Sequence, residues 1–223
     1  MSTGQPIGLF GGAFDPIHYG HLRTAFELSQ ALGLTEVRFL PTGNPPHRGE
    51  LSGSAETRLA MVRAAAAGQP RFVVDDREVR RSGVSYSIDT LTELRGEYPD
   101  RSLCLLLGMD AFLGLPNWHR WRELFDLAHV VVAHRPGWKA PVRGPLGEVM
   151  VDRGTGSIRE LREQRAGRIY VHAGTQLEIS STELRQLLEA GRDPLYLVPD
   201  SVRRIIYETG CYARNGSEGP HAA

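Results

Sequence analysis

Two glycines and two histidines near the start of the chain have the types and spacing of a phosphate-binding site. Gly11 and Gly12 directly follow the short apolar run 7–10, which predicts a buried first strand. A turn without Cβ atoms lets backbone N–H groups approach an anion. His18 and His21 lie three residues apart, where a helix is expected to begin near residue 20. The unpaired N–H donors of a helix N-terminus, together with two imidazoles, predict a polyphosphate site.

Other interpretations of these residues explain less of the run 11–21. The chain has no Gly-x-x-x-x-Gly-Lys-Ser/Thr loop and no Gly-x-Gly-x-x-Gly segment after the first strand. A metal site is disfavoured because His18 and His21 have no Glu or Cys partner at familiar ligand spacing. A purely structural role would explain the turn glycines or the helix-start histidines separately, but it explains the whole run 11–21 poorly.

The elements that would position these residues form an alternating pattern. Apolar runs predict strands at residues 7–10, 36–40, 71–74, 103–107, 129–133 and 168–171, with helix-like segments between most of them. Such alternation indicates an α/β fold with helices on both faces of a parallel sheet, which is the Rossmann-like, doubly wound arrangement. The runs 103–107 and 130–133 are the most continuous, so we expect them at the centre of the sheet.

Four segments that could carry chemistry follow the ends of predicted strands, at residues 11–21, 41–48, 108–110 and 134–137. Ligands of open parallel sheets bind beyond the C-terminal strand ends, so these segments are expected to converge on one crevice. Asp110 is placed to accept hydrogen bonds from a ribose, and its main alternative is to cap a helix N-terminus. Asp15 is expected to brace the glycine turn rather than to bind a metal.

Composition excludes several classes of protein. The chain has 223 residues, of which 41% are hydrophobic, and its formal net charge is zero, so neither nucleic acid nor a membrane surface is an expected partner. Only two cysteines occur, and Cys104 lies inside an apolar run, as a free buried thiol would. No segment reads as a membrane span or a secretory leader, which predicts a cytoplasmic protein.

One domain is expected over residues 1–213, with a helical segment at its C-terminal end. Residues 137–167 form a connection that includes a predicted helix over 157–164, and the sequence does not indicate its role. Asp200 resembles the N-cap of a last helix that Gly210 ends, and residues 214–223 have the composition of a frayed tail. The oligomeric state stays open, and a homo-oligomer is compatible with the sequence.

The run 11–21 closely resembles the nucleotidyltransferase signature Gly-Gly-Ser/Thr-Phe-Asp-Pro-x-His-x-Gly-His, in the version found in bacterial nicotinate mononucleotide adenylyltransferases. Position 13 departs from it, because Ala13 stands where the family usually has serine or threonine. The resemblance continues through nearly the whole chain. Matching blocks follow in order at residues 41–48, 58–61, 85–91, 108–110, 118–121, 134–137 and 179–185.

The resemblance implies the transfer of AMP from ATP to nicotinate mononucleotide, with release of pyrophosphate. His18 and His21 are the implied catalytic residues, and protonated imidazoles would stabilise charge best, so activity is expected to fall as they lose their protons. Mg²⁺ is expected to bridge the triphosphate, held by phosphates and water rather than by a protein metal site. The implied ATP-binding residues are Gly11, Gly12, Ala13, Phe14, His18, His21, Gly108, Asp110, Ser180, Ser181, Thr182 and Arg185.

Some of these residues have structural alternatives. Ser180 to Arg185 resemble the family's second triphosphate-binding element, but Ser180 with Glu183 also fits a capping box, and the two uses can coexist. Trp118 could offer a flat face to a pyridine ring, whereas Trp121 is expected to pack or to support it. The implied acceptor-binding residues are Thr90, Trp118, His47 and Arg48.

Two rival functions stay open at this stage. One is another adenylyltransferase of the same fold, acting on nicotinamide mononucleotide or phosphopantetheine. Acid and amide acceptors differ by one group, and sequence does not place the N–H donors that would discriminate them. The other rival is a non-enzymatic nucleotide sensor, against which the intact His18, His21 and Arg185 argue.

Overall fold

Seven parallel strands form one sheet in the part of the chain that the computed structural model describes, which is residues 5–46, 51–134, 141–175 and 177–213. Their order is β3-β2-β1-β4-β5-β7-β6, so the chain order reverses between β1 and β4. The strands are β1 (Ile7–Gly12), β2 (Glu36–Pro41), β3 (Phe72–Val74), β4 (Leu103–Gly108), β5 (His129–His134), β6 (Gly154–Thr155) and β7 (Ile169–Ala173).

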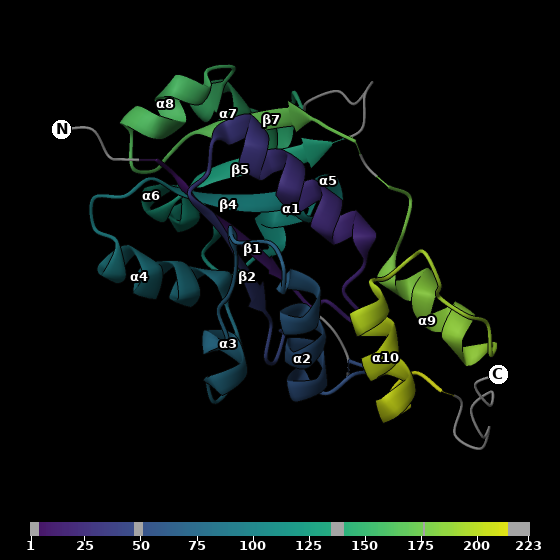
Figure 1. Ribbon diagram of the computed structural model, residues 1–223. Helices are drawn as coiled ribbons and strands as arrows, with labels where there is room; N and C mark the ends of the chain where they lie inside the picture. Colours follow the sequence, from purple (N-terminus) through teal and green to yellow (C-terminus); the bar gives the residue numbers. More distant parts are fainter. Residues whose placement is uncertain (1–4, 47–50, 135–140, 176, 214–223) are drawn as a thin grey trace.

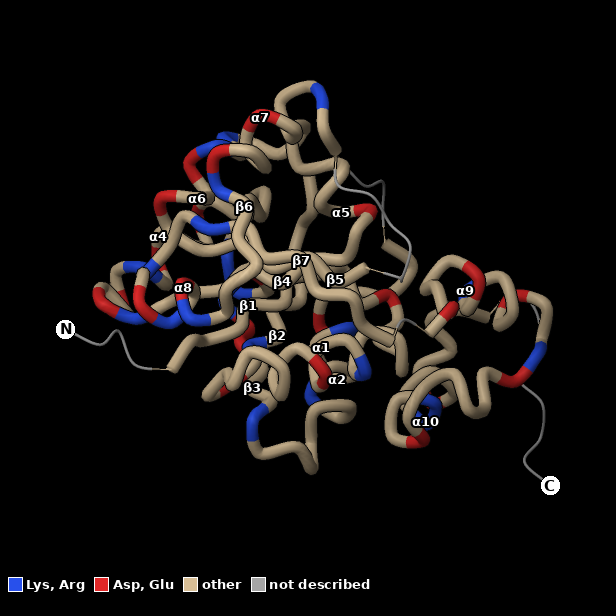
Figure 2. Tube along the Cα trace, turned by 90° about the horizontal axis from the view of Figure 1, so that it is seen from above, with Lys and Arg blue, Asp and Glu red and all other residues tan. Residues whose placement is uncertain are grey.

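The α/β prediction is confirmed, and so are the six predicted strands, to within about two residues at each end. β4 and β5 are almost fully buried and lie in the middle of the sheet, as expected for uninterrupted apolar runs. In Figure 2 the strands in the middle of the sheet carry no charged residue, whereas charges gather on the surrounding helices. β6 has only two residues, Gly154 and Thr155, and such a pair gives no apolar run to recognise.

Helices follow most of the strands. They are α1 (Tyr19–Leu32), α2 (Ala55–Ala66), α3 (Arg77–Arg80), α4 (Ser87–Glu97), α5 (Met109–Leu113), α6 (Leu124–Leu127), α7 (Gly144–Arg153), α8 (Ile158–Glu163), α9 (Ser181–Glu189) and α10 (Asp200–Thr209). Single 3₁₀ turns lie at Leu115–Asn117 and Trp121–Glu123. The predicted helix over 157–164 is α8, while α7 in the same connection was not predicted. No described helix is both long and apolar enough to cross a bilayer.

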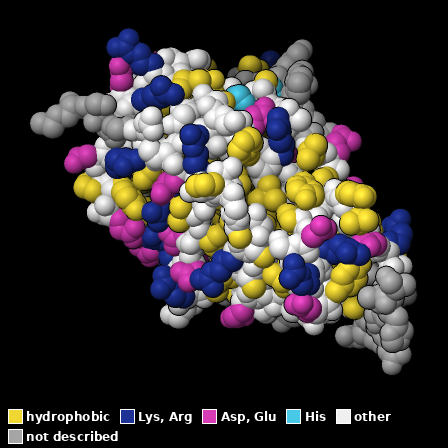
Figure 3. All heavy atoms as spheres, viewed as in Figure 1, with side chains coloured by type: hydrophobic (Ala, Val, Ile, Leu, Met, Phe, Trp, Pro, Cys, Tyr) yellow, Lys and Arg dark blue, Asp and Glu magenta, His cyan; other side chains and the backbone are white. Residues whose placement is uncertain are grey.

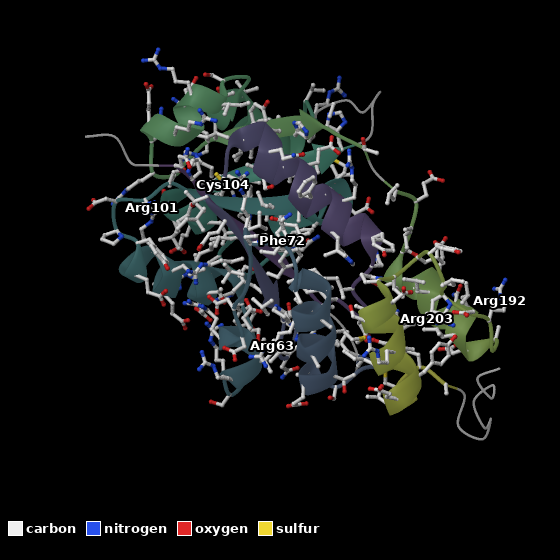
Figure 4. All side chains as sticks on the ribbon, in the orientation of Figure 1. Arg63, Phe72, Arg101, Cys104, Arg192 and Arg203 are labelled. Carbon is white, nitrogen blue, oxygen red and sulfur yellow. The ribbon has the colours of Figure 1, made fainter. Side chains whose placement is uncertain are left out.

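Two hydrophobic cores lie on opposite faces of the sheet. Side chains of α1, α2, α8, α9 and α10 build one core, and those of α4, α5, α6 and α7 build the other. In Figure 1, α1 lies in front of the sheet, and α5 and α6 lie behind it. Cys104 of β4 is fully buried in the first core, in the upper left part of the view in Figure 4, and it is a free thiol as expected. A doubly wound sheet leaves its ligand site at the strand ends, outside both cores.

Local signals set the helix boundaries that matter for the site. α1 buries Ala25, Leu28 and Leu32 and ends at Gly33, whose φ of +64° is the left-handed conformation that favours glycine. The last helix also ends at a glycine, Gly210, as predicted. Asp200 is its first helical residue rather than its N-cap, because Pro199 takes the cap position.

α9 and α10 form the C-terminal helical segment, to the right of the sheet in Figure 1. α10 packs against α2, and Arg203 of α10 donates two hydrogen bonds to Asp193 in the turn after α9 (Figure 4). The segment therefore holds the start of α9 beside the end of β1. On the face shown in Figure 3, acidic and basic side chains are interspersed, which agrees with the zero net charge. Residues 214–223 lie outside the described part of the chain.

Candidate active site

Two adjoining cavities open at the C-terminal ends of β1 and β4, where the strand order reverses. The larger cavity has a volume of about 980 Å³ and the smaller one about 310 Å³. The wall that they share is made of Phe10, Gly11, Gly12, Ala13, Gly108 and Ala111. A ligand in one cavity can therefore meet a ligand in the other across the ends of these two strands.

The start of α1 supplies two stacked imidazoles to the larger cavity. His18 is the N-cap of this 14-residue helix, and its ring stacks on that of His21 with centroids 3.7 Å apart. A Cβ on Gly20 would lie 2.9 Å from Nδ1 of His18, so only glycine leaves room for the ring. The three-residue spacing of the histidines and the glycine between them together bring both rings to the helix N-terminus.

The hydrogen bonds of the two histidines differ. The backbone N–H of His18 donates to Nδ1 of His21 at 3.4 Å, so a neutral His21 ring carries its proton on Nε2. The Nδ1 atom of His18 is buried and has no hydrogen-bond partner in the described residues. Burial lowers the pKa of His18 to about 4, and its imidazole is therefore neutral at pH 7 in the unliganded protein. An anion beside the ring would raise this pKa.

Gly11 and Gly12 serve the turn in different ways. A Cβ on Gly12 would lie 3.2 Å from the ring of Phe14, which is buried beneath the turn at a strained φ of +48°. A Cβ on Gly11 would meet nothing within 4 Å. Gly11 therefore leaves open space on the wall between the two cavities, while Gly12 accommodates the Phe14 ring.

The start of α9 forms the opposite side of the larger cavity. The hydroxyl of Ser180 accepts a hydrogen bond from the N–H of Glu183, so the expected cap is present. Ser181 donates to the carbonyl of Pro16 at 3.0 Å, and Arg185 donates to the carbonyl of Asp15 at 2.7 Å. These bonds tie α9 to the segment that carries the histidines. Two helix N-termini and a guanidinium thus surround one volume, which favours anions.

Two buried ionisable residues, Arg58 and Asp15, support the segments around the glycine turn. Arg58 of α2 is 1% exposed and donates to the carbonyls of Ala13 (2.7 Å), Gly43 (3.2 Å) and Gly53 (3.1 Å). Asp15 accepts from the N–H of Gly53 at 2.9 Å and from the hydroxyl of Tyr212 at 2.7 Å. Asp15 therefore braces the turn before α2 and the chain after α10, and Arg58 is the residue that braces the glycine turn itself.

Asp110 lies on the rim of the larger cavity. It is exposed and sits in the first turn of α5, where Gly108 takes the N-cap position. Asp110 therefore does not cap α5, and the capping alternative is wrong. In the described residues, no three or more His, Cys, Asp or Glu side chains come together in a metal-binding group.

The smaller cavity has apolar and aromatic walls. Trp118 lines it, together with Tyr86 and His119, whose rings lie 4.5 Å apart. Trp121 instead packs its ring edge-to-face with Phe125 in the hydrophobic core, as the packing interpretation predicted. The two tryptophans do not share a helix, because Trp118 lies between the two 3₁₀ turns. The remaining polar residues of this wall are Thr42, Glu78, Ser85 and Ser87.

The chain is similar to proteins of one known family. Residues 9–187 match the family described as cytidylyltransferase-like. A probable nicotinate-nucleotide adenylyltransferase of Aeromonas hydrophila is 52% identical over 207 residues, which cover 93% of this chain and 97% of that protein. A protein of Halorhodospira halophila with the same name is 48% identical over 208 residues, or 93% and 95% of the two chains. The chain belongs to the nicotinate-nucleotide adenylyltransferase family.

The fold of this family member has a counterpart among solved structures. The nicotinic acid mononucleotide adenylyltransferase of Plasmodium falciparum, determined in complex with NaAD, superposes with a TM-score of 0.71. The match covers 93% of this chain and 97% of that one at 17% sequence identity, so it concerns the fold alone. It agrees with the doubly wound sheet that the alternating pattern predicts.

The structure gathers most of the residues predicted for this adenylyltransferase site. All twelve predicted ATP-binding residues line the larger cavity, and their contact with ATP stays a prediction. Trp118 lines the smaller cavity. Thr90 is buried and is not among the residues that line either cavity, because it lies one helical turn beyond Ser87, which does. His47 and Arg48 lie outside the described residues.

Sequence reasoning missed several residues at the site. Ser87 and Tyr86 fall inside a block that was recognised, but the start of α4 was not placed closely enough to select them. Glu78 gave no signal, since an acidic residue in an arginine-rich segment resembles a solvated surface. Arg58 was part of a matching block without a role. An arginine within the buried positions of α2 is the signal that could have found it.

Proposed function

We propose that this chain catalyses transfer of the adenylyl group of ATP to nicotinate mononucleotide, which yields nicotinate adenine dinucleotide and pyrophosphate. The observation that carries the proposal is the pair of adjoining cavities, one lined by anion-binding groups and one by aromatic rings. ATP would occupy the larger cavity and the mononucleotide the smaller one. The α-phosphorus and the attacking phosphate would then meet at the shared wall of Gly11, Gly12 and Ala13.

The chemical step needs no protein nucleophile. An oxygen of the acceptor phosphate attacks the α-phosphorus, a new P–O bond forms on one side, and the bond to the pyrophosphate oxygen breaks on the other. The acceptor phosphate is already an anion at neutral pH. Catalysis therefore comes from alignment of the two reactants and from donors that face the charge on the α-phosphate and the leaving group.

The two helix N-termini of the larger cavity are suited to the triphosphate. His18 and His21 would donate to it from α1, and Arg185 with the hydroxyl of Thr182 from α9. His18 is neutral in the unliganded protein, because its burial lowers its pKa to about 4. The negative charge of the triphosphate would raise that pKa, so His18 would become a charged donor on binding.

ATP would enter as its complex with a divalent cation, and we propose Mg²⁺. No group of three or more potential protein ligands exists in the described residues, so the ion would be held by phosphates and water. Asp110, on the rim, fits the adenosine ribose as a hydrogen-bond acceptor. Both substrates are phosphorylated small molecules, and we place the reaction in the cytoplasm.

The smaller cavity fits a pyridine mononucleotide. Trp118 would stack on the positively charged pyridine ring. The N-terminus of the 11-residue helix α4 begins at Ser87 on the same wall, and its N–H donors favour a carboxylate over a carboxamide. This end of α4 is our reason for proposing the acid rather than the amide as acceptor.

Pyrophosphate release by the purified protein tests the proposal. ATP and Mg²⁺ would be combined in parallel with nicotinate mononucleotide, nicotinamide mononucleotide or phosphopantetheine. We expect strong release with the first acceptor alone. Release with the amide would overturn the specificity and leave the chemistry standing, whereas no release with any acceptor would favour a nucleotide sensor.

A further inference from the structure

A single acidic side chain lines the smaller cavity in the described part of the chain. Glu78 belongs to α3, and only 6% of its surface is exposed. Its backbone lies against Gly43 in the segment after β2. The two are so close that a Cβ on Gly43 would collide with the Glu78 carbonyl. A buried carboxyl on the wall of a cavity that takes an anionic nucleotide has no evident part in the chemistry proposed above.

A chain of hydrogen bonds fixes the direction of this carboxyl. Thr90 donates its one hydroxyl proton to Oε1 of Glu78 at 2.7 Å. Arg81 donates to the same hydroxyl oxygen at 3.0 Å and also pairs with Glu93 at 2.6 Å. The side chain of Thr90 therefore has one orientation, and it holds one oxygen of Glu78. The sequence assigned Thr90 to the acceptor, whereas its position in the structure lets it act through Glu78.

The charge of the carboxyl limits what it can face. Burial raises the pKa of Glu78, and hydrogen bonds from Thr90 and Thr42 and the charge of Arg81 oppose that rise. A carboxylate attracts hydrogen-bond donors and repels anions. The proposed acceptor has an anionic phosphate at one end and an anionic carboxylate on its ring. Between them lies a ribose, whose hydroxyl groups are its donors.

We propose that Glu78 accepts a hydrogen bond from a ribose hydroxyl of the acceptor nucleotide and that Thr90 is its positioning residue. This inference rests on the proposed function and adds a sugar-reading residue to it. The site would then reject an acceptor that lacks the hydroxyl, because the buried carboxyl would lose that hydrogen bond and keep only those made within the protein. A site built to bond a hydroxyl rejects the analogue without it far more strongly than an apolar pocket rejects a missing methylene.

The experiment compares ribose and deoxyribose acceptors in wild-type protein and in Glu78→Gln. Nicotinate mononucleotide and its 2′-deoxy and 3′-deoxy analogues would be assayed by kcat/KM at saturating ATP. Wild-type protein is expected to prefer the ribose form over one deoxy analogue by about 100-fold. Glu78→Gln is expected to reduce that preference to about threefold or less, with the KM of ATP unchanged.

A second pair of variants separates positioning from folding. Thr90→Val keeps the shape of the side chain and removes its hydroxyl, and it should reduce the ribose preference. Thr90→Ser keeps the hydroxyl and should restore the wild-type preference. These two variants also test the proposal if Glu78→Gln fails to fold.

Three results would overturn the inference. The first is an equal ribose preference in wild-type protein and Glu78→Gln, and the second is the same preference in Thr90→Val and Thr90→Ser. The third is a change in acid-over-amide preference in place of ribose preference, since it would place Glu78 against the ring. Failure of the proposed function looks different, because wild-type protein would then not turn over nicotinate mononucleotide at all.

Discussion

The two cavities of the site are built in different ways. The larger cavity draws most of its polar groups from two short stretches, α1 and the start of α9, with Asp110 and His134 added at the ends of β4 and β5. The smaller cavity takes its side chains from several separate segments, which contribute among others Thr42, Glu78, Ser87 and Trp118. Phosphate recognition uses helix ends and glycine turns, which are local features. Recognition of a ring and a sugar uses side chains brought together by tertiary structure.

The charges of the two cavities differ as well. The larger one has His18, His21 and Arg185 on its walls with Asp110 on its rim, and the smaller one has the acid Glu78 in its wall. The larger cavity is therefore suited to a polyanion. The smaller one is suited to a molecule with a cationic ring and hydroxyl groups between its anionic ends. The difference predicts that substitutions in the two cavities will impair different substrates.

The largest effect is expected from His21→Ala. Removal of a donor that faces the α-phosphate or the leaving group should lower kcat by about 100- to 1,000-fold. Steady-state kinetics with both substrates saturating measure this loss. Thermal unfolding is the control, since His21 is only partly buried and the variant should fold. A variant that folds normally and keeps full turnover would contradict the mechanism.

Trp118→Ala and Arg185→Ala test the division between the cavities directly. Loss of the stacking partner should raise the KM of the mononucleotide by about tenfold and leave that of ATP unchanged. Loss of the guanidinium should raise the KM of ATP by about 10- to 100-fold and leave that of the mononucleotide unchanged. Paired substrate titrations give both constants for each variant.

Trp121→Phe is the matched control for this pair. Its ring packs in the core against Phe125, so the substitution should lower the thermal stability and change neither KM. The assignment of one substrate to each cavity would be wrong if Trp118→Ala and Arg185→Ala raised the KM of the same substrate.

The next effect is a proton taken up when pyrophosphate binds. The pKa of His18 is about 4 in the free protein because the ring is buried, and a bound anion raises it. His18 then holds more protons in the complex than in the free protein, so its contribution to the affinity rises as the pH falls from 7 toward 4. Calorimetry at pH 6, in buffers of different ionisation heat, measures the uptake. It should be larger for wild-type protein than for His18→Asn.

His129 provides the control for this proton. Burial also lowers its pKa to about 4, but its ring bonds the carbonyl of Gln164 and the N–H of Arg168, away from both cavities. Both histidines bind protons more readily in the unfolded chain, so the unliganded protein loses stability as the pH falls from about 6.5 to 4. His129→Gln should reduce that loss and leave the uptake unchanged. Equal uptake in wild-type protein and His18→Asn would remove His18 from the anion site.

The smallest effect is expected from Ala13→Ser, which restores the hydroxyl usual in the family. Ala13 lies on the wall between the cavities, where its backbone is held by Arg58. The backbone N–H can serve a phosphate without the hydroxyl, so kcat/KM should change by about threefold or less. A gain of about 100-fold would show that the glycine turn of this chain is catalytically impaired.

The sequence predicted the sheet and the larger cavity because the residues that form each of them are grouped in short runs of the chain. β4 and β5 are continuous apolar runs, and the start of α1 is marked by glycines and histidines within eleven residues. The smaller cavity was predicted poorly because its polar and aromatic side chains come from separate parts of the chain. Selecting Ser87 over Thr90 requires knowing the residue at which α4 begins. Recognising Glu78 requires knowing that α3 packs against Gly43.

The central claim is that the two cavities hold the two substrates on either side of Gly11, Gly12 and Ala13. A crystal structure with a non-hydrolysable ATP analogue and nicotinate mononucleotide tests it most directly. We predict the triphosphate between the histidines of α1 and Arg185 of α9, and the pyridine ring against Trp118. A mononucleotide bound in the larger cavity, or a triphosphate bound away from both helix N-termini, would contradict the account.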